Sequence, residues 1–127
     1  MKKLISTTLL ATTILLANSG EELTKQNGCM ECHNIMGKKA APAFMGTAKK
    51  NLKWYGNEAK ANIVKSIKNG SKGKYRQFAD TEMPAYSNIS ESDLDTIASW
   101  ILLEFQKKRA TMPGQGQKMG GQGKGRP

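Results

Sequence analysis

Apolar residues recur at helical spacing along the second half of the chain, and this pattern predicts a fold built from helices. The strongest helix is expected after Ser90, an N-cap residue that is followed by acidic side chains in the first turn. Its apolar positions lie three or four residues apart and are Leu94, Ile97, Ala98, Ile101 and Phe105, with Trp100 and Leu102 beside them. No segment alternates between apolar and polar residues as a half-buried strand does, so the predicted class is all-α.

A short helix is predicted near the N-terminus, because Ser19 and Glu22 have the spacing of a capping box. In that arrangement the serine side chain accepts a hydrogen bond from the glutamate backbone, and the glutamate side chain accepts one from the serine backbone. Leu23 is the apolar residue that this helix is expected to turn inward.

Two more helices are predicted in the middle of the chain. The first spans 47–55 with Thr47 as its N-cap, and the second spans 58–69 with Asn57 as its N-cap. Gly70 is expected to end the second, since glycine is the residue most often found just past a helix C-terminus. The segments predicted to be irregular are 34–46 and 71–82.

The first residues have the composition of a secretory signal. Two lysines precede an apolar stretch, residues 4–17, that is too short and too rich in threonine to span a bilayer comfortably. Small residues follow, so we predict a signal peptide of residues 1–19 that is removed after Ser19. Removal after Ala17 and an uncleaved anchor are the alternatives. Export of this kind predicts a periplasmic protein.

The formal charge of +10 is unevenly distributed along the chain. Residues 20–106, the predicted folded domain, hold 12 basic and 10 acidic residues and so carry only +2. A nearly neutral domain lacks the basic surface that nucleic-acid binding needs, so no nucleic-acid partner is predicted. Residues 107–127 hold six basic residues and no acidic one, and are predicted to form a disordered Gly/Gln/Lys tail that is able to contact an acidic surface.

The segment Cys29-Met30-Glu31-Cys32-His33 has the form C-x-x-C-H, the attachment signature of a c-type haem. Two thiols on one turn can add to the two vinyl groups of one porphyrin, and the imidazole that follows can bind its iron. Cys29 and Cys32 are the only cysteines of the chain, and His33 is its only histidine. We therefore predict one haem c per chain, which would also add apolar core to a small domain.

Three other kinds of site fit this segment less well. A zinc site prefers four nitrogen or sulfur ligands, and the chain offers three, crowded together. A thioredoxin-like redox pair follows a strand of a βαβ unit, and no strand-like run precedes Cys29. A structural disulfide across so short a loop would stabilise the fold little.

The second axial ligand of the iron cannot be another histidine of this chain, because there is none. Methionine sulfur is an alternative that c-type haem sites use. The methionines after the start residue are Met30, Met36, Met45, Met83, Met112 and Met119. Two of these lie in or just after the attachment turn and two lie in the tail, which leaves Met45 and Met83. Met83 is favoured, because Pro84 stiffens its loop.

The chain resembles the short bacterial class I cytochromes c from about Glu21 to Phe105. The matching stretches are Asn27-Gly28-Cys29-x-x-Cys32-His33, Pro42, Ile67-Lys68-Asn69-Gly70-Ser71, Met83-Pro84, and Trp100 in the last helix. The resemblance implies a small cytochrome c-like helical fold wrapped round one haem. In it, Cys29 and Cys32 would form the thioethers, and His33 and Met83 would be the axial ligands.

The resemblance also implies supporting roles for three residues. Pro42 would offer its carbonyl to His33, Tyr75 would lie near a haem propionate, and Asn88 would hydrogen-bond Met83. The segment 70–83 looks longer than its counterpart in the family, and this departure bears on Tyr75 and Asn88.

The expected function is electron carriage rather than enzyme catalysis, because an iron with two protein ligands has no open position for substrate. A monomer would meet redox proteins, membrane-bound or soluble, in brief contacts that charge steers. The lysines available to surround the haem edge are Lys38, Lys39, Lys49, Lys50, Lys72 and Lys74. The alternatives are a haem-bearing subunit of a larger dehydrogenase or oxidoreductase complex, and a haem enzyme or sensor with an open sixth position.

Deleting residues 112–127 should leave the haem spectrum and the thermal midpoint unchanged, because that stretch has no apolar period with which to pack. If the tail binds an acidic surface, the affinity of the full chain should fall steeply with salt, and that of the truncated chain only weakly. Thermal unfolding and binding at two salt concentrations measure both effects. A shifted midpoint would show instead that the tail docks on the domain.

Overall fold

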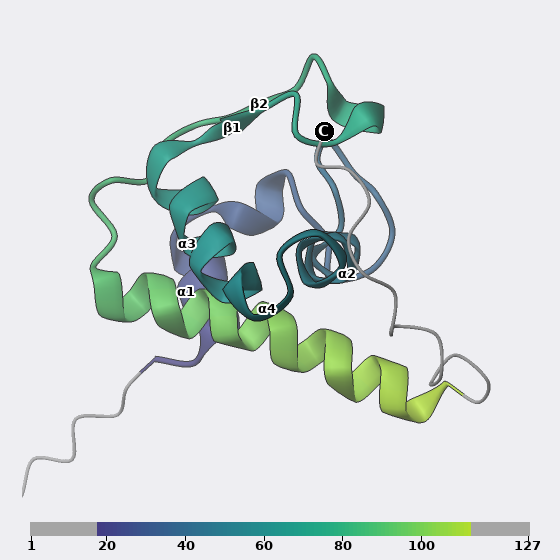
Figure 1. Cartoon of the computed structure of the whole chain (residues 1–127). Helices are drawn as coiled ribbons and strands as arrows, with labels where there is room; N and C mark the ends of the chain where they lie inside the picture. The colour runs from purple at the N-terminus through teal and green to yellow at the C-terminus, as the bar shows by residue number, and fades with distance from the viewer. Residues whose placement is uncertain (1–17, 113–127) are drawn as a thin grey trace, which may run out of the picture.

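One long C-terminal helix organises the domain, and three shorter helices pack against it (Figure 1). The computed structural model describes residues 18–112. The helices are α1 (Gly20–Gln26), α2 (Phe44–Tyr55), α3 (Ala59–Asn69) and α4 (Glu91–Thr111). None of the helices in this range is long and apolar enough to cross a membrane. The predicted all-α class is confirmed.

The remaining elements are short. Residues 18–112 contain three 3-10 turns, η1 (Cys29–Glu31), η2 (Gly56–Glu58) and η3 (Arg76–Phe78). Two strands of two residues each, β1 (Ser71–Lys72) and β2 (Glu82–Met83), pair antiparallel, with Ser71 opposite Met83. The sequence predicted no strand, because a two-residue ladder is too short for an apolar alternation to appear.

The ends of α1 and α4 follow the sequence prediction. The Ser19 hydroxyl accepts a hydrogen bond from the Glu22 backbone at 3.2 Å, and the Glu22 carboxylate accepts one from the Ser19 backbone at 2.9 Å, which completes the capping box. At α4, the Ser90 hydroxyl accepts a hydrogen bond from the Asp93 backbone at 3.1 Å. Both helix starts therefore rest on side chains that the sequence identifies.

Two predicted N-caps are wrong. The helix α2 begins at Phe44 rather than after Thr47, since the backbone N–H groups of Phe44 and Met45 donate to carbonyl groups of the preceding loop at 2.9 and 3.1 Å. The loop thus satisfies donors that a capping side chain would have satisfied. The helix α3 begins at Ala59 after the turn η2 and has no side-chain cap, so Asn57 does not cap it.

The last helix also runs five residues further than predicted. It ends at Thr111, whereas the tail was expected to begin at residue 107. An ion pair between Lys107 and Glu104 (2.9 Å) stabilises the extension, and Lys108 and Arg109 place positive charge at the negative end of the helix dipole. Residues 113–127, and residues 1–17 of the predicted signal peptide, lie outside the described part of the chain.

The predicted apolar stripes form the core. The four α4 residues Leu94, Ile97, Ala98 and Ile101 are at most 2% exposed, and residues of the other helices join them: Leu23, Phe44, Ala48, Ile63 and Ile67. Gly20 lets α1 approach α4 closely, because a side-chain carbon at this position would lie 2.2 Å from Cβ of Trp100. The helices therefore close on one side, and the opposite side of the core is left for the pocket described below.

Gly70 fixes the direction in which the chain leaves α3. Its φ of 77° and ψ of 175° lie in a region that is open essentially to glycine only. A side-chain carbon here would also lie 2.7 Å from the carbonyl oxygen of Met83 and 3.1 Å from the nitrogen of Ala85. This close approach lets the chain after β2 lie against the end of α3, where the Tyr86 N–H donates to the Ile67 carbonyl at 3.0 Å.

Gly70→Ala should lower the free energy of unfolding by about 2–5 kcal/mol, because it combines backbone strain with a clash against backbone atoms. Gly37→Ala is the matched control, since Gly37 has a φ of 76° but nothing lies within 4 Å of a side-chain carbon placed there. The control should lose about 1–2 kcal/mol from its backbone conformation alone. Equal losses in denaturant unfolding of the two variants would contradict the role given to the close approach.

Candidate functional site

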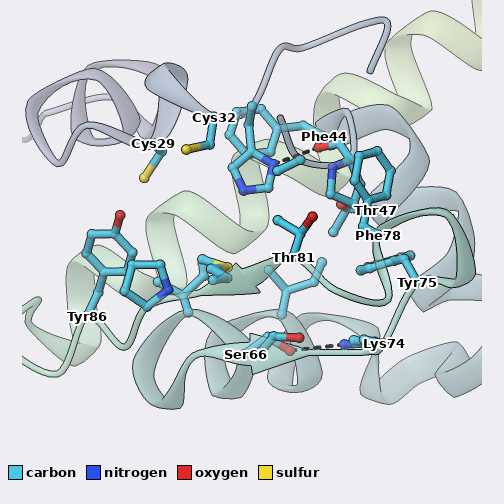
Figure 2. Close-up of a pocket in the computed structure, with 18 of the residues that line it drawn as sticks. Cys29, Cys32, Phe44, Thr47, Ser66, Lys74, Tyr75, Phe78, Thr81 and Tyr86 are labelled. Carbon is cyan, nitrogen blue, oxygen red and sulfur yellow. Dashed lines mark hydrogen bonds between the residues drawn. The ribbon is translucent and has the colours of Figure 1, made fainter. Parts of the chain in front are cut away.

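A pocket opens between the C-x-x-C-H segment, the helices α2, α3 and α4, and the β1–β2 arm. Its empty volume is about 1030 Å³, part of which is open to solvent. Figure 2 shows the two cysteines at one end of the pocket, and Tyr75 and Lys74 at the other. The predicted site residues that line it are Cys29, Cys32, His33, Pro42, Tyr75 and Met83.

The two thiols are presented by the turn η1. Gly28 opens this turn with a φ of 70°, and the N–H groups of Cys32 and His33 both donate to the carbonyl of Cys29, at 3.3 and 3.0 Å. Cys29 is buried and Cys32 is exposed, and the two are not joined by a disulfide. Burial, with a smaller contribution from Cys32, raises the pKa of the Cys29 thiol. Both sulfur atoms therefore remain available for covalent attachment.

His33 is held by the carbonyl of Pro42, as predicted. Its Nδ1 lies 2.6 Å from the Pro42 oxygen, which fixes the neutral tautomer that donates from Nδ1 and leaves the lone pair of Nε2 free. Burial lowers the pKa of His33, although the hydrogen bond to Pro42 opposes this shift. The Phe44 ring stacks on the imidazole with a centroid distance of 5.0 Å and an interplanar angle of 15°. The imidazole is thus neutral, oriented and able to bind a metal.

The loop that carries Pro42 is pinned to the attachment segment. The Ala41 N–H donates to the Cys32 carbonyl at 2.9 Å, and Nζ of Lys39 donates to the Met30 carbonyl at 3.0 Å. Trp100 of α4 meets the edge of Phe44 with a centroid distance of 5.6 Å and an angle of 76°. Loop and helix together keep the imidazole in place, and this contact gives Trp100 a structural role.

Met83 is the one methionine among residues 18–112 that lines the pocket. It is half-buried in β2, and its strand is tied to β1 through the pairing with Ser71. Met45, the other candidate from the sequence, packs partly against the core outside the pocket lining. Met36 and Met112 are exposed, and Met119 lies outside the described residues.

The two remaining predicted residues have different surroundings. Tyr75 lines the pocket, where its hydroxyl accepts a hydrogen bond from Nδ2 of the buried Asn51 at 3.1 Å, and burial raises its pKa. Asn88 is exposed and is not brought to the pocket, because a turn closed by the Ile89 N–H and the Tyr86 carbonyl at 3.3 Å buries Ile89 instead. Tyr86 lines the pocket from this segment.

The sequence patterns missed several polar residues of the site. Asn51 is fully buried on the same face of α2 as Phe44 and Ala48. A search for apolar residues at helical spacing does not identify it, because its side chain is polar. Lys74 is predicted only as one of six lysines that could surround the haem edge, whereas the structure half-buries it in the pocket lining. Other lining residues without a sequence signal are Thr24, Thr47, Phe78, Thr81 and Tyr86.

The residues of the pocket fit a covalently attached haem. Two unlinked thiols lie at one end, an imidazole with a free nitrogen and a thioether line the same space, and Ile63, Ile97 and Ile101 provide apolar walls. An apolar macrocycle with two reactive vinyl groups and an iron requires this set of groups. A zinc site has less support, since no three His, Cys, Asp or Glu side chains within residues 18–112 are placed so that they could hold one metal ion.

Comparison with known proteins gives the same assignment. The family model "Cytochrome c" matches residues 17–103. The chain is 36% identical over 107 residues to cytochrome c-551 of Pseudomonas aeruginosa, which covers 80% of this chain and 97% of that protein. It is 32% identical over 98 residues to cytochrome c-552 of Nitrosomonas europaea, which covers 75% and 90%.

A solved structure extends the similarity to three dimensions. The crystal structure of wild-type Nitrosomonas europaea cytochrome c552 superposes with a TM-score of 0.55 and 32% identity, over 65% of this chain and 95% of that one. The alignments with these relatives cover nine-tenths or more of each relative's length. The chain therefore belongs to the cytochrome c family, as a short class I member that transfers electrons with one covalently attached haem c.

Proposed function

We propose that this protein carries single electrons in the periplasm, with its haem attached through Cys29 and Cys32 and its iron bound by His33 and Met83. One observation carries the proposal: a single pocket is lined by both thiols, by the imidazole and by just one methionine of the described residues. When bound, the haem supplies an iron that alternates between two oxidation states one electron apart.

Two contacts prepare His33 for its role. The Pro42 carbonyl accepts the Nδ1 proton, so the other ring nitrogen presents its lone pair without prior loss of a proton. The stacked ring of Phe44 restricts rotation of the imidazole. A ligand that keeps one orientation in both oxidation states suits rapid electron transfer, since little of the protein has to rearrange.

Met83 supplies the property that separates a carrier from a catalyst. A thioether is a neutral, soft ligand, and its presence opposite a histidine raises the reduction potential of a haem iron. The β1–β2 pairing and the close approach at Gly70 hold this segment in place. If His33 and Met83 both bind the iron, substrate and diatomic gases would have no open site, which favours the carrier over the enzyme or sensor.

The apolar walls favour the same function. Ile97 and Ile101 of α4 and Ile63 of α3 line the pocket and are at most 2% exposed. Such surroundings keep water from the iron and control its potential, because a low dielectric disfavours the more highly charged state. The same three side chains belong to the core of the domain.

Redox proteins are the partners of an electron carrier of this family. Brief contacts between redox proteins bury little surface and are steered by charge. Among the lysines proposed for the haem edge, four are exposed on the domain surface: Lys38, Lys39, Lys49 and Lys72. Location in the periplasm is supported by the predicted signal peptide at residues 1–19. Co-purification with a larger subunit would instead favour the subunit of a complex.

Met83→Ala should lower the reduction potential, because it removes the ligand that stabilises ferrous iron. We expect at least a tenfold change in the ratio of reduced to oxidised protein, about 59 mV for one electron. The ferric absorption band of the sulfur–iron bond should disappear, and the ferrous variant should bind carbon monoxide. Redox titration and absorption spectroscopy measure these changes.

Met45→Ala is the matched control for this experiment. Met45 packs against the core outside the pocket lining, so its loss should cost stability and leave the potential, the absorption band and ligand exclusion as they were. Ready binding of carbon monoxide by the unaltered protein, with no further change in Met83→Ala, would contradict the carrier and favour the sensor or enzyme.

Cys32→Ser and Cys29→Ser should each leave at most one thioether, and the double variant should lose most of its folded protein. The reason is the pocket, because without a tethered group the core has an unfilled centre. Haem content per chain after acid–organic extraction and the yield of folded protein measure the effect. Unchanged helicity and yield in a haem-free double variant would remove the haem from the account of the fold.

A further inference from the structure

The ammonium group of Lys74 is held inside the pocket rim by three neutral oxygen atoms. Its Nζ donates to Oδ1 of Asn62 at 2.6 Å and to Oγ of Ser66 at 3.0 Å, both on α3, and lies 3.3 Å from Oδ1 of Asn51 on α2. Figure 2 shows the contact with Ser66. Two helices thus fix the position of one cation.

No carboxylate within residues 18–112 forms an ion pair with this cation. Lysines elsewhere in the described chain pair with carboxylates on the surface, but none of these ion pairs includes Lys74. Its other close neighbour is the Tyr55 ring, whose centroid lies 5.4 Å from Nζ. Burial lowers the pKa of Lys74, which is the cost expected when an ammonium leaves water without an anion beside it.

Asn51 connects this cation to the rest of the site. Its side chain is fully buried, and Nδ2 donates both to the Thr47 carbonyl at 2.8 Å and to the Tyr75 hydroxyl at 3.1 Å. Those two donations orient the amide so that its oxygen faces Lys74. The cation is therefore part of a hydrogen-bonded group. Within the described residues, every buried side-chain nitrogen and oxygen atom has a hydrogen-bond partner.

The position of Lys74 in the pocket indicates which group its positive charge would pair with. The cysteines lie at one end of the pocket, whereas Lys74 and Tyr75 lie at the opposite end (Figure 2). A haem carries its vinyl groups and its two propionate groups on opposite edges. A haem whose vinyl edge is joined to the thiols would direct its propionate edge toward Lys74.

We propose that the Lys74 ammonium is the counter-charge of a haem propionate and is held in position by Asn51, Asn62 and Ser66. The inference rests on the attachment through Cys29 and Cys32 given in the proposed function. A buried cation stabilises a fold when an anion pairs with it and hydrogen bonds satisfy its remaining protons, and the three oxygen contacts meet the second condition. Lys74 is a positioning residue here, since it acts on the periphery of the haem and not on the iron.

The pairing has a measurable consequence for the propionate. A cation within about 4–6 Å favours the ionised carboxylate, so the propionate should remain charged to a lower pH than it would alone. Loss of a proton from a propionate favours ferric iron and so lowers the reduction potential. Titratable groups at this end of the pocket are Tyr55 and Lys50 on α2, Tyr75 itself, and the paired Lys72 and Glu82 of the β1–β2 arm. The helix α3 contributes the neutral Asn62 and Ser66.

The test is the reduction potential of the haem-loaded protein as a function of pH. In Lys74→Met the fall in potential with rising pH should have its midpoint about one pH unit or more above that of the unaltered protein. Lys74→Arg keeps the charge and should restore the original midpoint. Lys65→Gln removes one positive charge from the exposed face of α3 and should leave the midpoint where it was.

Coincident profiles for Lys74→Met and the unaltered protein would overturn the proposal, as would an equal shift in Lys65→Gln. If Lys74→Met does not accumulate, Lys74→Gln removes the charge and keeps a polar group, with the same expected shift. The absorption band of the sulfur–iron bond tests the proposed function separately. If the band is absent from the unaltered protein, Met83 is not the ligand. If the band is present in every variant but the profiles of potential against pH coincide, only the role of Lys74 is contradicted.

Discussion

The structure depends on a pocket that the chain surrounds and does not fill with its own side chains. The four helices of residues 18–112 close a core on one side, and on the other they leave a largely apolar pocket that is partly open to solvent and is lined by α2, α3, α4 and the segments between them. Apolar walls that no side chain packs against lose contacts, and this costs stability. A bound, covalently tethered macrocycle is therefore part of the core, and haem attachment and folding are two aspects of the same packing.

The two proposed iron ligands are positioned by different means. His33 follows the attachment turn directly and is oriented by Pro42 and Phe44, so its geometry is determined within a short stretch of chain. Met83 is 50 residues away in sequence and reaches the pocket because the chain turns back at Gly70 and pairs β2 with β1. The proximal side is thus built by local contacts, and the opposite side by tertiary contacts.

The sequence predicted what short-range rules control. The C-x-x-C-H segment, the capping box at Ser19 and the apolar stripe of α4 each depend on residues within one or two turns of one another, and the structure contains all three. The start of α2 was wrong, because loop carbonyl groups distant in sequence replace the capping side chain. The burial of Asn51 and Lys74 and the exposure of Asn88 were missed for the same reason, since tertiary packing decides which polar side chains enter a site.

The most direct test of the account is iron-edge X-ray absorption of the purified, haem-loaded protein. We expect the fine structure to require one sulfur and five nitrogen atoms around the iron, because Met83 is the one methionine of the described chain that lines the pocket with His33. The thioether sulfur atoms of the attached cysteines lie beyond the coordination sphere and do not contribute to that count. A coordination sphere of nitrogen and oxygen alone, or one with an open sixth position, would contradict the account.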